Sequence, residues 1–205
     1  MQPTSIYLLR HGACTGGQIF RGRTDSPCTP EGFSQMRATL DSLPALDGVI
    51  SSPLVRCAAP AQDFARARGI SCTLESAFAE IDFGTWEGRL VAEVEAESPS
   101  AIAAFWRDPV HHAPPAAETL PDFRARVAGA WQALLTQWAG KQVVLVTHGG
   151  VIRMILAELL AMPLRPLSHL HVPHASLSLI RNFHAPDQPD WPQLIFHNGR
   201  AGDDH

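Results

Sequence analysis

The chain has 205 residues, of which 45% are hydrophobic and 18% are charged, and its formal net charge is -4. This composition excludes a wholly disordered chain and predicts one globular domain with a sizeable core. A single lysine, Lys141, among the 16 basic residues leaves no lysine-rich surface for nucleic acid, and no apolar stretch reaches the roughly 18 residues of a membrane span.

Strands and helices are predicted to alternate along the chain. Three apolar runs are typical of buried strands and lie at residues 6–9, 48–52 and 142–147. Four segments with apolar residues at helical spacing are expected to be helices, at 31–43, 54–68, 120–138 and 151–160. Beyond Pro163, two more strands are expected to extend one sheet edge before a frayed tail, at 176–181 and 193–197, with the tail at 201–205.

This alternation predicts an α/β fold, a three-layer sandwich in which helices flank a mainly parallel sheet. The region from about 78 to 121 breaks the pattern, because it is rich in proline, alanine and acidic residues. We expect it to be a small insertion, a lid over the active site, within a single domain that spans residues 1–205. Trp86 and Trp106 in this lid either pack within it or stack on a flat base.

Polar side chains follow the three predicted strands at the point where each strand ends. Arg10 and His11 follow the first strand, Ser52 ends the second, and His148 follows the third. Ligands of open sheets bind beyond the carboxyl ends of the strands, so these side chains are expected to meet there. Arg56, in the first turn of the helix predicted after the second strand, is expected to face the same edge.

These residue types suit phosphoryl transfer without a metal ion or another cofactor. A neutral imidazole can attack phosphorus, and His11 beside Arg10 is the candidate nucleophile. A planar guanidinium matches two phosphate oxygens, which makes Arg10 and Arg56 candidate phosphate ligands. His148 and Gly149 lie at a predicted helix N-terminus, where free N–H groups and the helix dipole favour an anion.

Five sequence blocks in a fixed order resemble the histidine phosphatase superfamily, the phosphoglycerate-mutase-like proteins, over nearly the whole chain. The blocks are LLRHG (8–12), RGRTDSPCTPEG (21–32), SSPLVR (51–56), EIDFGTWEG (80–88) and VTHGGVIR (146–153). The resemblance implies that His11 becomes transiently phosphorylated and that Arg10, Arg56 and His148 bind the phosphate. It also implies Glu80 as the proton donor to the leaving group and then the base for water.

Other parts of the site are less well defined by the blocks. Asp82 is the rival acid to Glu80, and Arg23 in the second block is a further candidate for substrate binding. Ala13, Cys14 and Gly17 stand where the family often has an acidic residue, a threonine and an asparagine. Thr15, or backbone N–H groups beside it, is expected to replace the phosphate contact of that asparagine.

The cysteines and the remaining histidines are candidates for metal or redox sites. No two of the four cysteines form a CxxC pair, which favours free thiols in a reducing, cytoplasmic setting. Cys14 near the nucleophile is either an oxidant-sensitive thiol or an inert buried one. The histidines outside the strand ends lack carboxylates or cysteines at ligand spacing, so we expect surface histidines and no metal site, at His111, His112, His169, His171 and His174.

Weaker features point to a substrate. FGTWEGR (83–89) and NGRA (198–201) resemble the α-ribazole phosphatases of cobalamin nucleotide-loop assembly. We therefore expect a phosphatase of α-ribazole 5'-phosphate, a small phosphorylated metabolite, acting as a monomer or homodimer without nucleic acid or membrane partners. A broad-specificity histidine phosphatase is the main alternative. A phosphoglycerate mutase is disfavoured because Arg89 and Arg107 are the only lysines or arginines from 78 to 121, and a catalytically silent phosphate-binding protein is disfavoured by the complete residue set.

Overall fold

The computed structural model describes residues 2–165, 169–184 and 190–199. Its centre is a six-stranded sheet with the order β3-β2-β4-β1-β5-β6, in which the first four strands are parallel and the last two run antiparallel to their neighbours. The strands are β1 (Thr4–Arg10), β2 (Gly48–Ser51), β3 (Ser71–Leu74), β4 (Gln142–Thr147), β5 (Leu177–Phe183) and β6 (Trp191–Gly199). The predicted three-layer α/β sandwich is confirmed.

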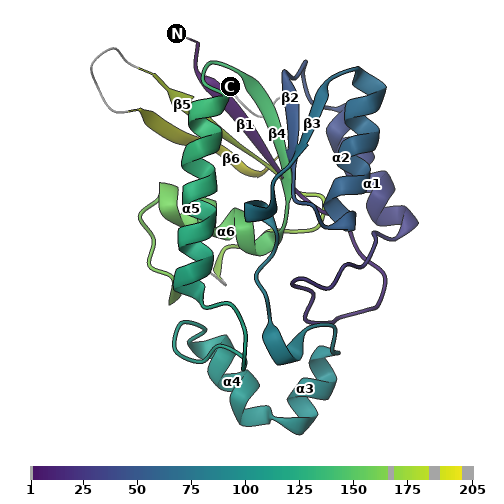
Figure 1. The fold of residues 1–205 in the computed structure, drawn as a ribbon, viewed down its shortest axis with the longest axis vertical. Coiled ribbons are helices and arrows are strands. Elements are labelled where there is room, and N and C mark those ends of the chain that lie inside the picture. Colours follow the sequence, from purple (N-terminus) through teal and green to yellow (C-terminus); the bar gives the residue numbers. More distant parts are fainter. Residues whose placement is uncertain (1, 166–168, 185–189, 200–205) are drawn as a thin grey trace.

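Helices cover both faces of the sheet (Figure 1). Helices α1 (Pro30–Asp41) and α2 (Val55–Arg68) lie on one face, and α5 (Leu120–Gln137) and α6 (Gly149–Leu159) lie on the other. Successive strand residues point to opposite faces, so in β1 Ile6 and Leu8 pack with α5 and α6, whereas Tyr7 and Leu9 pack with α1 and α2. A strand buried on both sides needs an unbroken apolar run, and this is the pattern of the sequence.

Threonine side chains cap the first turns of α1 and α5. Thr29 accepts a hydrogen bond from the Gly32 N–H at 3.0 Å at the start of α1, and Thr119 caps α5 in the same way through Asp122 N at 3.2 Å. Helix α6 starts at Gly149, two residues before the predicted start, so the paired glycines form part of its first turn. No helix within the described ranges has the length and apolarity needed to cross a membrane.

The structure contains elements that the sequence pattern did not predict. Strand β3 is a four-residue edge strand and mostly exposed, so it lacks the apolar run of the inner strands. The predicted lid contains two short helices, α3 (Val91–Glu97) and α4 (Pro99–Arg107), and the single turn η2 (Gly84–Trp86). The single turn η1 (Ser76–Phe78) precedes the lid and packs into the main core through its last residue. The predicted tail at 201–205 lies outside the described residues.

The lid has a small core of its own, separate from the two cores of the sheet. Phe20 from the β1–α1 loop packs there with Trp86, Val94, Ile102 and Phe105. The ring centroids of Phe20 and Trp86 lie 4.9 Å apart, and those of Trp86 and Phe105 lie 5.5 Å apart. Helices α3 and α4 extend from the end of the sheet at which the parallel strands finish (Figure 1). The lid therefore stands next to the carboxyl edge, where the candidate residues were expected.

Candidate active site

The ends of the three inner parallel strands bring the predicted residues together. His11 follows β1, and its backbone N–H continues the pairing with β4 by donating to Thr147 O at 2.9 Å. His148 follows β4, and the two imidazole rings lie edge to face with centroids 5.2 Å apart. Ser52 follows β2 and contacts the second of these rings. The expected convergence at the carboxyl edge is thus present in the structure.

The ring of His11 is oriented by its own loop. His11 Nδ1 lies 2.8 Å from Gly12 O and 3.5 Å from the sulfur of Cys14. A carbonyl oxygen only accepts, so Nδ1 carries the hydrogen in this contact. The lone pair of the neutral imidazole is then on Nε2, which is the atom available for attack.

His148 is completely buried between polar partners. Arg56 Nε donates to its Nδ1 at 3.3 Å, so the remaining hydrogen is on Nε2, which lies 2.7 Å from Ser52 Oγ. Burial lowers the pKa of His148 well below its ordinary value, and the positive charge of Arg56 lowers that pKa further. His148 is therefore neutral and fixed in one tautomer.

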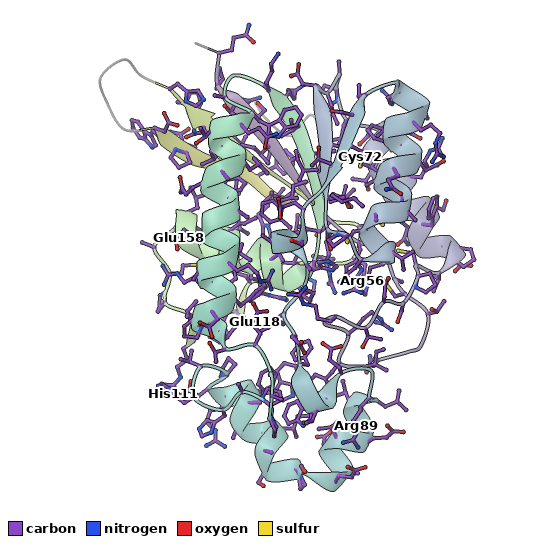
Figure 2. All side chains as sticks on the ribbon, in the orientation of Figure 1. Arg56, Cys72, Arg89, His111, Glu118 and Glu158 are labelled. Carbon is purple, nitrogen blue, oxygen red and sulfur yellow. The ribbon has the colours of Figure 1, made fainter. Side chains whose placement is uncertain are left out.

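Arg56 has no exposed surface and lies at the end of the sheet that faces the lid (Figure 2). Its guanidinium donates to three backbone carbonyls of the β1–α1 loop, Arg21 O at 3.3 Å, Gly22 O at 2.7 Å and Thr24 O at 2.8 Å. Together with the bond to His148, these contacts use four of the five N–H groups of a guanidinium. Arg56 supplies a buried positive charge whose position the loop determines.

Arg10 extends from the end of β1 across the N-terminus of α6. It donates to Val172 O, and its Nη2 lies 3.1 Å from Nε2 of His174. Its buried Nε has no acceptor among the described residues. A Cβ atom on Gly149 would lie 3.3 Å from this Nε, so the glycine allows the guanidinium to approach the helix closely.

Glu80 faces the same helix terminus from the start of the lid. Its Oε2 accepts from Gly150 N at 3.0 Å, and its Oε1 accepts from Ile81 N at 3.1 Å. A Cβ atom on Gly150 would lie 2.2 Å from Glu80 Oε1, so any side chain there would have to displace the carboxylate from its present position. Asp82, the rival acid, accepts from Gly84 N at 2.7 Å and so stabilises the turn η2.

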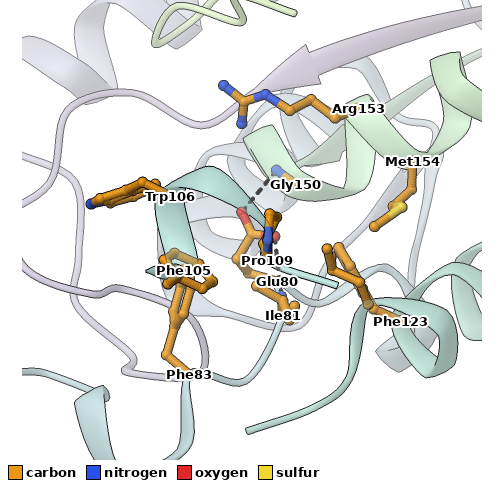
Figure 3. Close-up of a pocket in the computed structure, with 11 residues that line it drawn as sticks. Glu80, Ile81, Phe83, Phe105, Trp106, Pro109, Phe123, Gly150, Arg153 and Met154 are labelled. Atoms are coloured by element: carbon orange, nitrogen blue, oxygen red, sulfur yellow. Dashed lines mark hydrogen bonds between the residues drawn. The ribbon is translucent and has the colours of Figure 1, made fainter. Parts of the chain in front are cut away.

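An apolar cavity of about 400 Å³ opens beside Glu80 (Figure 3). Glu80 and Arg153 supply its charged groups, while aromatic and aliphatic side chains from the lid, α5 and α6 form the rest of the wall. The lining consists of Glu80, Ile81, Phe83, Phe105, Trp106, Pro109, Leu120, Phe123, Gly150, Arg153 and Met154. Trp86 is buried in the lid core, whereas Trp106 is 55% exposed and lines this cavity.

Two residues of the site were not predicted. His174 is exposed, as expected of a surface histidine, but it also contacts Arg10 and has its ring centroid 5.5 Å from that of His11. Partial burial and the charge of Arg10 lower the pKa of His174 to about 4, so it accepts from Arg10 as a neutral ring. Arg153 lines the cavity while its Nε donates to Leu170 O at 2.8 Å. Arg153 lies in VTHGGVIR, one helical turn after the paired glycines, and this position was the signal in the sequence from which it could have been predicted.

Two predicted substrate contacts lie further out. Thr15 is exposed, and its hydroxyl is 3.4 Å from Pro27 O. Arg23 is also exposed, and its guanidinium is 4.0 Å from the carboxylate of Glu118. Their binding roles stay predictions. Across the described part of the chain, no three His, Cys, Asp or Glu side chains are grouped closely enough to hold a metal ion.

Comparison with known proteins identifies the family. A sequence model of the histidine phosphatase superfamily (branch 1) matches residues 6–188. A bifunctional protein of Mycobacterium tuberculosis is 31% identical over 182 residues, which cover 86% of this chain and 50% of that protein. The chain thus spans about half the length of this relative.

Two further proteins match over most of their length. A glucosyl-3-phosphoglycerate phosphatase of Mycolicibacterium vanbaalenii is 31% identical over 176 residues, 80% of this chain and 77% of that protein. The crystal structure of the α-ribazole phosphatase from Shigella flexneri superimposes with a TM-score of 0.82 at 25% identity, covering 96% of this chain and 97% of that one. The fold is therefore that of a known phosphatase.

The contact between Glu80 and Gly150 predicts the effect of a small substitution. Gly150→Ala places a methyl group where the carboxylate lies, so we expect phosphate release from p-nitrophenyl phosphate to fall about tenfold or more, because a displaced general acid loses most of its effect. The matched control is Gly129→Ala in α5, where an added Cβ meets nothing within 4 Å. The control should keep its activity and gain up to about 1 kcal/mol of stability. Wild-type turnover by Gly150→Ala would contradict the assignment.

Burial of neutral His148 predicts a pH dependence of stability. Above about pH 6.5, the ordinary pKa of histidine, the ring is neutral in both folded and unfolded chains and contributes no pH dependence. Below that pH the unfolded chain binds a proton that the folded chain excludes, so the free energy of unfolding falls by about 1.4 kcal/mol per pH unit through this residue. Urea unfolding of wild type and His148→Gln between about pH 7 and pH 5 measures this term. Equal slopes for the two proteins would disprove it.

Proposed function

We propose, because this chain belongs to the histidine phosphatase superfamily, that it is a metal-independent phosphomonoesterase that acts through a phosphohistidine at His11. We further propose that its ligand is a small phosphorylated metabolite with a flat aromatic leaving group, and that this metabolite is α-ribazole 5'-phosphate. The phosphatases among its relatives support the reaction class. The geometry of the site and its cavity supports the substrate class.

The observation that carries the proposal is the buried Nε of Arg10, which has no acceptor among the described residues. Buried donors without a partner are rare, and one at a ligand site indicates the ligand atom that completes it. This donor lies beside the N-terminus of α6 and near the rings of His11 and His148, where the charges of Arg10 and Arg56 and the dipole of the helix favour an anion. A phosphate oxygen satisfies the donor and brings phosphorus within reach of His11.

The first step of the proposed reaction is attack by His11 Nε2 on phosphorus. Gly12 O holds the hydrogen on Nδ1, so the lone pair remains on the attacking atom. Arg10 and Arg56 offset the negative charge of the phosphoryl oxygens. His148 is neutral, so it contributes the dipole of its fixed ring and no further positive charge. Glu80 gives its proton to the departing oxygen. In the second step Glu80 takes a proton from water, which displaces the phosphoryl group from His11.

The cavity supports an aromatic leaving group, because it begins at Glu80 and is otherwise mainly apolar. Phe83, Phe105 and Trp106 offer flat surfaces on the side of the lid (Figure 3). A polyhydroxylated sugar would lose hydrogen bonds to water there without recovering them from the wall. A flat apolar base loses few hydrogen bonds to water, and it can stack on the exposed ring of Trp106. A broad-specificity phosphatase of aromatic and apolar monoesters is the second candidate, since the same wall suits it.

A phosphoglycerate mutase fits less well. It must hold a second anionic group, yet among the described residues Arg153 is the only lysine or arginine that lines the cavity. Arg89 in the lid is paired with Glu97 at 2.6 Å and does not line it. A silent phosphate-binding protein is also disfavoured, because the nucleophile, the cations and the candidate acid are all present.

The role of Glu80 predicts a dependence on the leaving group. Glu80→Gln keeps an oxygen that can accept from Gly150 N but cannot donate a proton as an acid, so it should slow phosphate release from alkyl monoesters about 100-fold. Release from p-nitrophenyl phosphate should slow far less, because p-nitrophenolate needs little protonation. The comparison variant is Asp82→Asn. If Asp82→Asn shows the leaving-group dependence and Glu80→Gln does not, Asp82 is the acid.

The stacking role of Trp106 can be measured against a second exposed tryptophan. Trp106→Ala should lower kcat/KM for α-ribazole 5'-phosphate about tenfold, because stacking of a base on an aromatic side chain contributes roughly 1–3 kcal/mol. Its effect on glycerol phosphate should be small. Trp191, which is 68% exposed on β6 and outside the cavity, provides the control Trp191→Ala. Equal losses on both substrates would remove the argument for an aromatic ligand.

The decisive experiment measures initial rates of phosphate release in excess EDTA. The substrates are α-ribazole 5'-phosphate, p-nitrophenyl phosphate, glucosyl-3-phosphoglycerate and 3-phosphoglycerate. The highest kcat/KM for the ribazole supports the specific proposal, and similar low values throughout favour the broad-specificity phosphatase. His11→Ala should fold normally and release no phosphate. EDTA-sensitive turnover, or turnover by His11→Ala, would refute the mechanism.

A further inference from the structure

Two cysteines face each other beside the proposed nucleophile. Cys14 and Cys28 form an isolated antiparallel bridge between two segments of the β1–α1 loop. The backbone bonds lie on either side of this pair, from Thr15 N to Pro27 O at 3.0 Å and from Thr29 N to Ala13 O at 2.8 Å. The two cysteines therefore occupy a pair that is not itself hydrogen-bonded, in which Cα atoms approach to about 4.5 Å. This separation lies within the range that a disulfide spans.

The sulfur atoms differ in environment. A hydrogen bond from the Cys28 thiol lowers the pKa of Cys14, and His11 and the charge of Arg21 lower it further. The same hydrogen bond and burial raise the pKa of Cys28, whose sulfur also contacts Arg56 O at 3.3 Å. Both residues are partly exposed. The pair thus combines a reactive thiolate with a neighbouring thiol that can resolve it.

We propose that Cys14 and Cys28 are a redox modification site, which a hydroperoxide converts into a disulfide that slows phosphoryl transfer to His11. All four cysteines are free thiols in the structure, which therefore describes the reduced form. The kinetic half of the proposal rests on the proposed phosphatase function. Formation of the disulfide depends only on the geometry of the loop.

The chemistry has two steps. The Cys14 thiolate attacks one oxygen of hydrogen peroxide, the O–O bond breaks, and hydroxide leaves with the electron pair, which gives a sulfenic acid. The Cys28 sulfur then attacks the sulfur of the sulfenic acid. An S–S bond forms, the S–O bond breaks, and the thiol proton leaves with the hydroxide as water. Each sulfur loses one electron, and together the two sulfurs reduce one peroxide to one water and one hydroxide, which takes a proton from the solvent to give the second water.

The effect on the reaction follows from the contact with His11. The Cys14 sulfur lies 3.5 Å from His11 Nδ1, the ring atom that carries the hydrogen. A thiolate at this point stabilises the positive charge that develops on the ring when Nε2 bonds to phosphorus. A disulfide is neutral and a weak acceptor, so this stabilisation is lost. We expect kcat at roughly pH 8 to fall about three- to tenfold on oxidation and to recover with dithiothreitol.

Peptide mapping tests the linkage without using activity. Arg21 and Arg23 lie between the cysteines, so trypsin separates peptides 11–21 and 24–37 unless a disulfide joins them. The reduced full-length protein is treated with one equivalent of hydrogen peroxide, alkylated, digested and analysed by mass spectrometry. The expected product is the joined pair of peptides, lost on reduction. Separate alkylated peptides, or Cys14 oxidised to sulfinic acid beside free Cys28, would overturn the proposal.

Matched variants assign the chemistry. Cys72 lies on β3, far from Arg56 and the site (Figure 2), so Cys72→Ser should keep both the linkage and the reversible fall in kcat. Cys28→Ser should give no linkage and should leave a sulfenic acid on Cys14 that dimedone labels. A linkage with unchanged kcat would overturn the kinetic half. A linkage in a protein that hydrolyses no phosphate monoester would refute the proposed function and leave the modification site in place.

Discussion

The completely buried guanidinium of Arg56 connects the parts of the site. A charge without solvent is tolerated only when hydrogen bonds replace water, and here the carbonyls of Arg21, Gly22 and Thr24 do so, together with the ring of His148. That loop is held in turn by Glu87 of the lid, whose carboxylate accepts from the backbone N–H groups of residues 23, 24 and 83 and from the Thr24 hydroxyl. Helix α2, the β1–α1 loop, the lid and His148 therefore share one hydrogen-bond network.

The sequence predicted the interior of the fold better than its margins. Strand β4 has the predicted bounds because both of its faces are buried, so its four central residues form one apolar run. Strand β3 lies at an edge and is mostly exposed, so its four residues carry no such signal. Helices α3 and α4 are short, and short helices depend on tertiary packing more than on their own sequence. Their apolar residues Val94 and Ile102 are buried in the lid core, and this packing is not evident from the sequence of either helix alone.

The same distinction applies to the site. Arg10, His11 and His148 could be predicted because strand ends determine their positions, and Arg56 because it begins the next helix. His174 could not be predicted as part of the site, because its position depends on how the chain returns to the sheet. Just before β5 begins, the N–H of Ala175 donates to His11 O at 3.1 Å, and this bond places His174 beside the nucleophile. Such a contact depends on the folded path and leaves no local pattern. The close approach of Glu80 to Gly150 is likewise visible only in three dimensions, although the paired glycines marked the place.

The separate core of the lid has a consequence for how this protein can diversify. The groups proposed to handle phosphate come mainly from the strand ends and from α2 and α6, whereas Phe83, Phe105 and Trp106 of the cavity wall come from a region with its own small core. Substitutions in that region alter the surface offered to the leaving group and leave the sheet and its two large cores intact. Selection can therefore exchange one metabolite for another in this scaffold while the reaction at phosphorus stays the same.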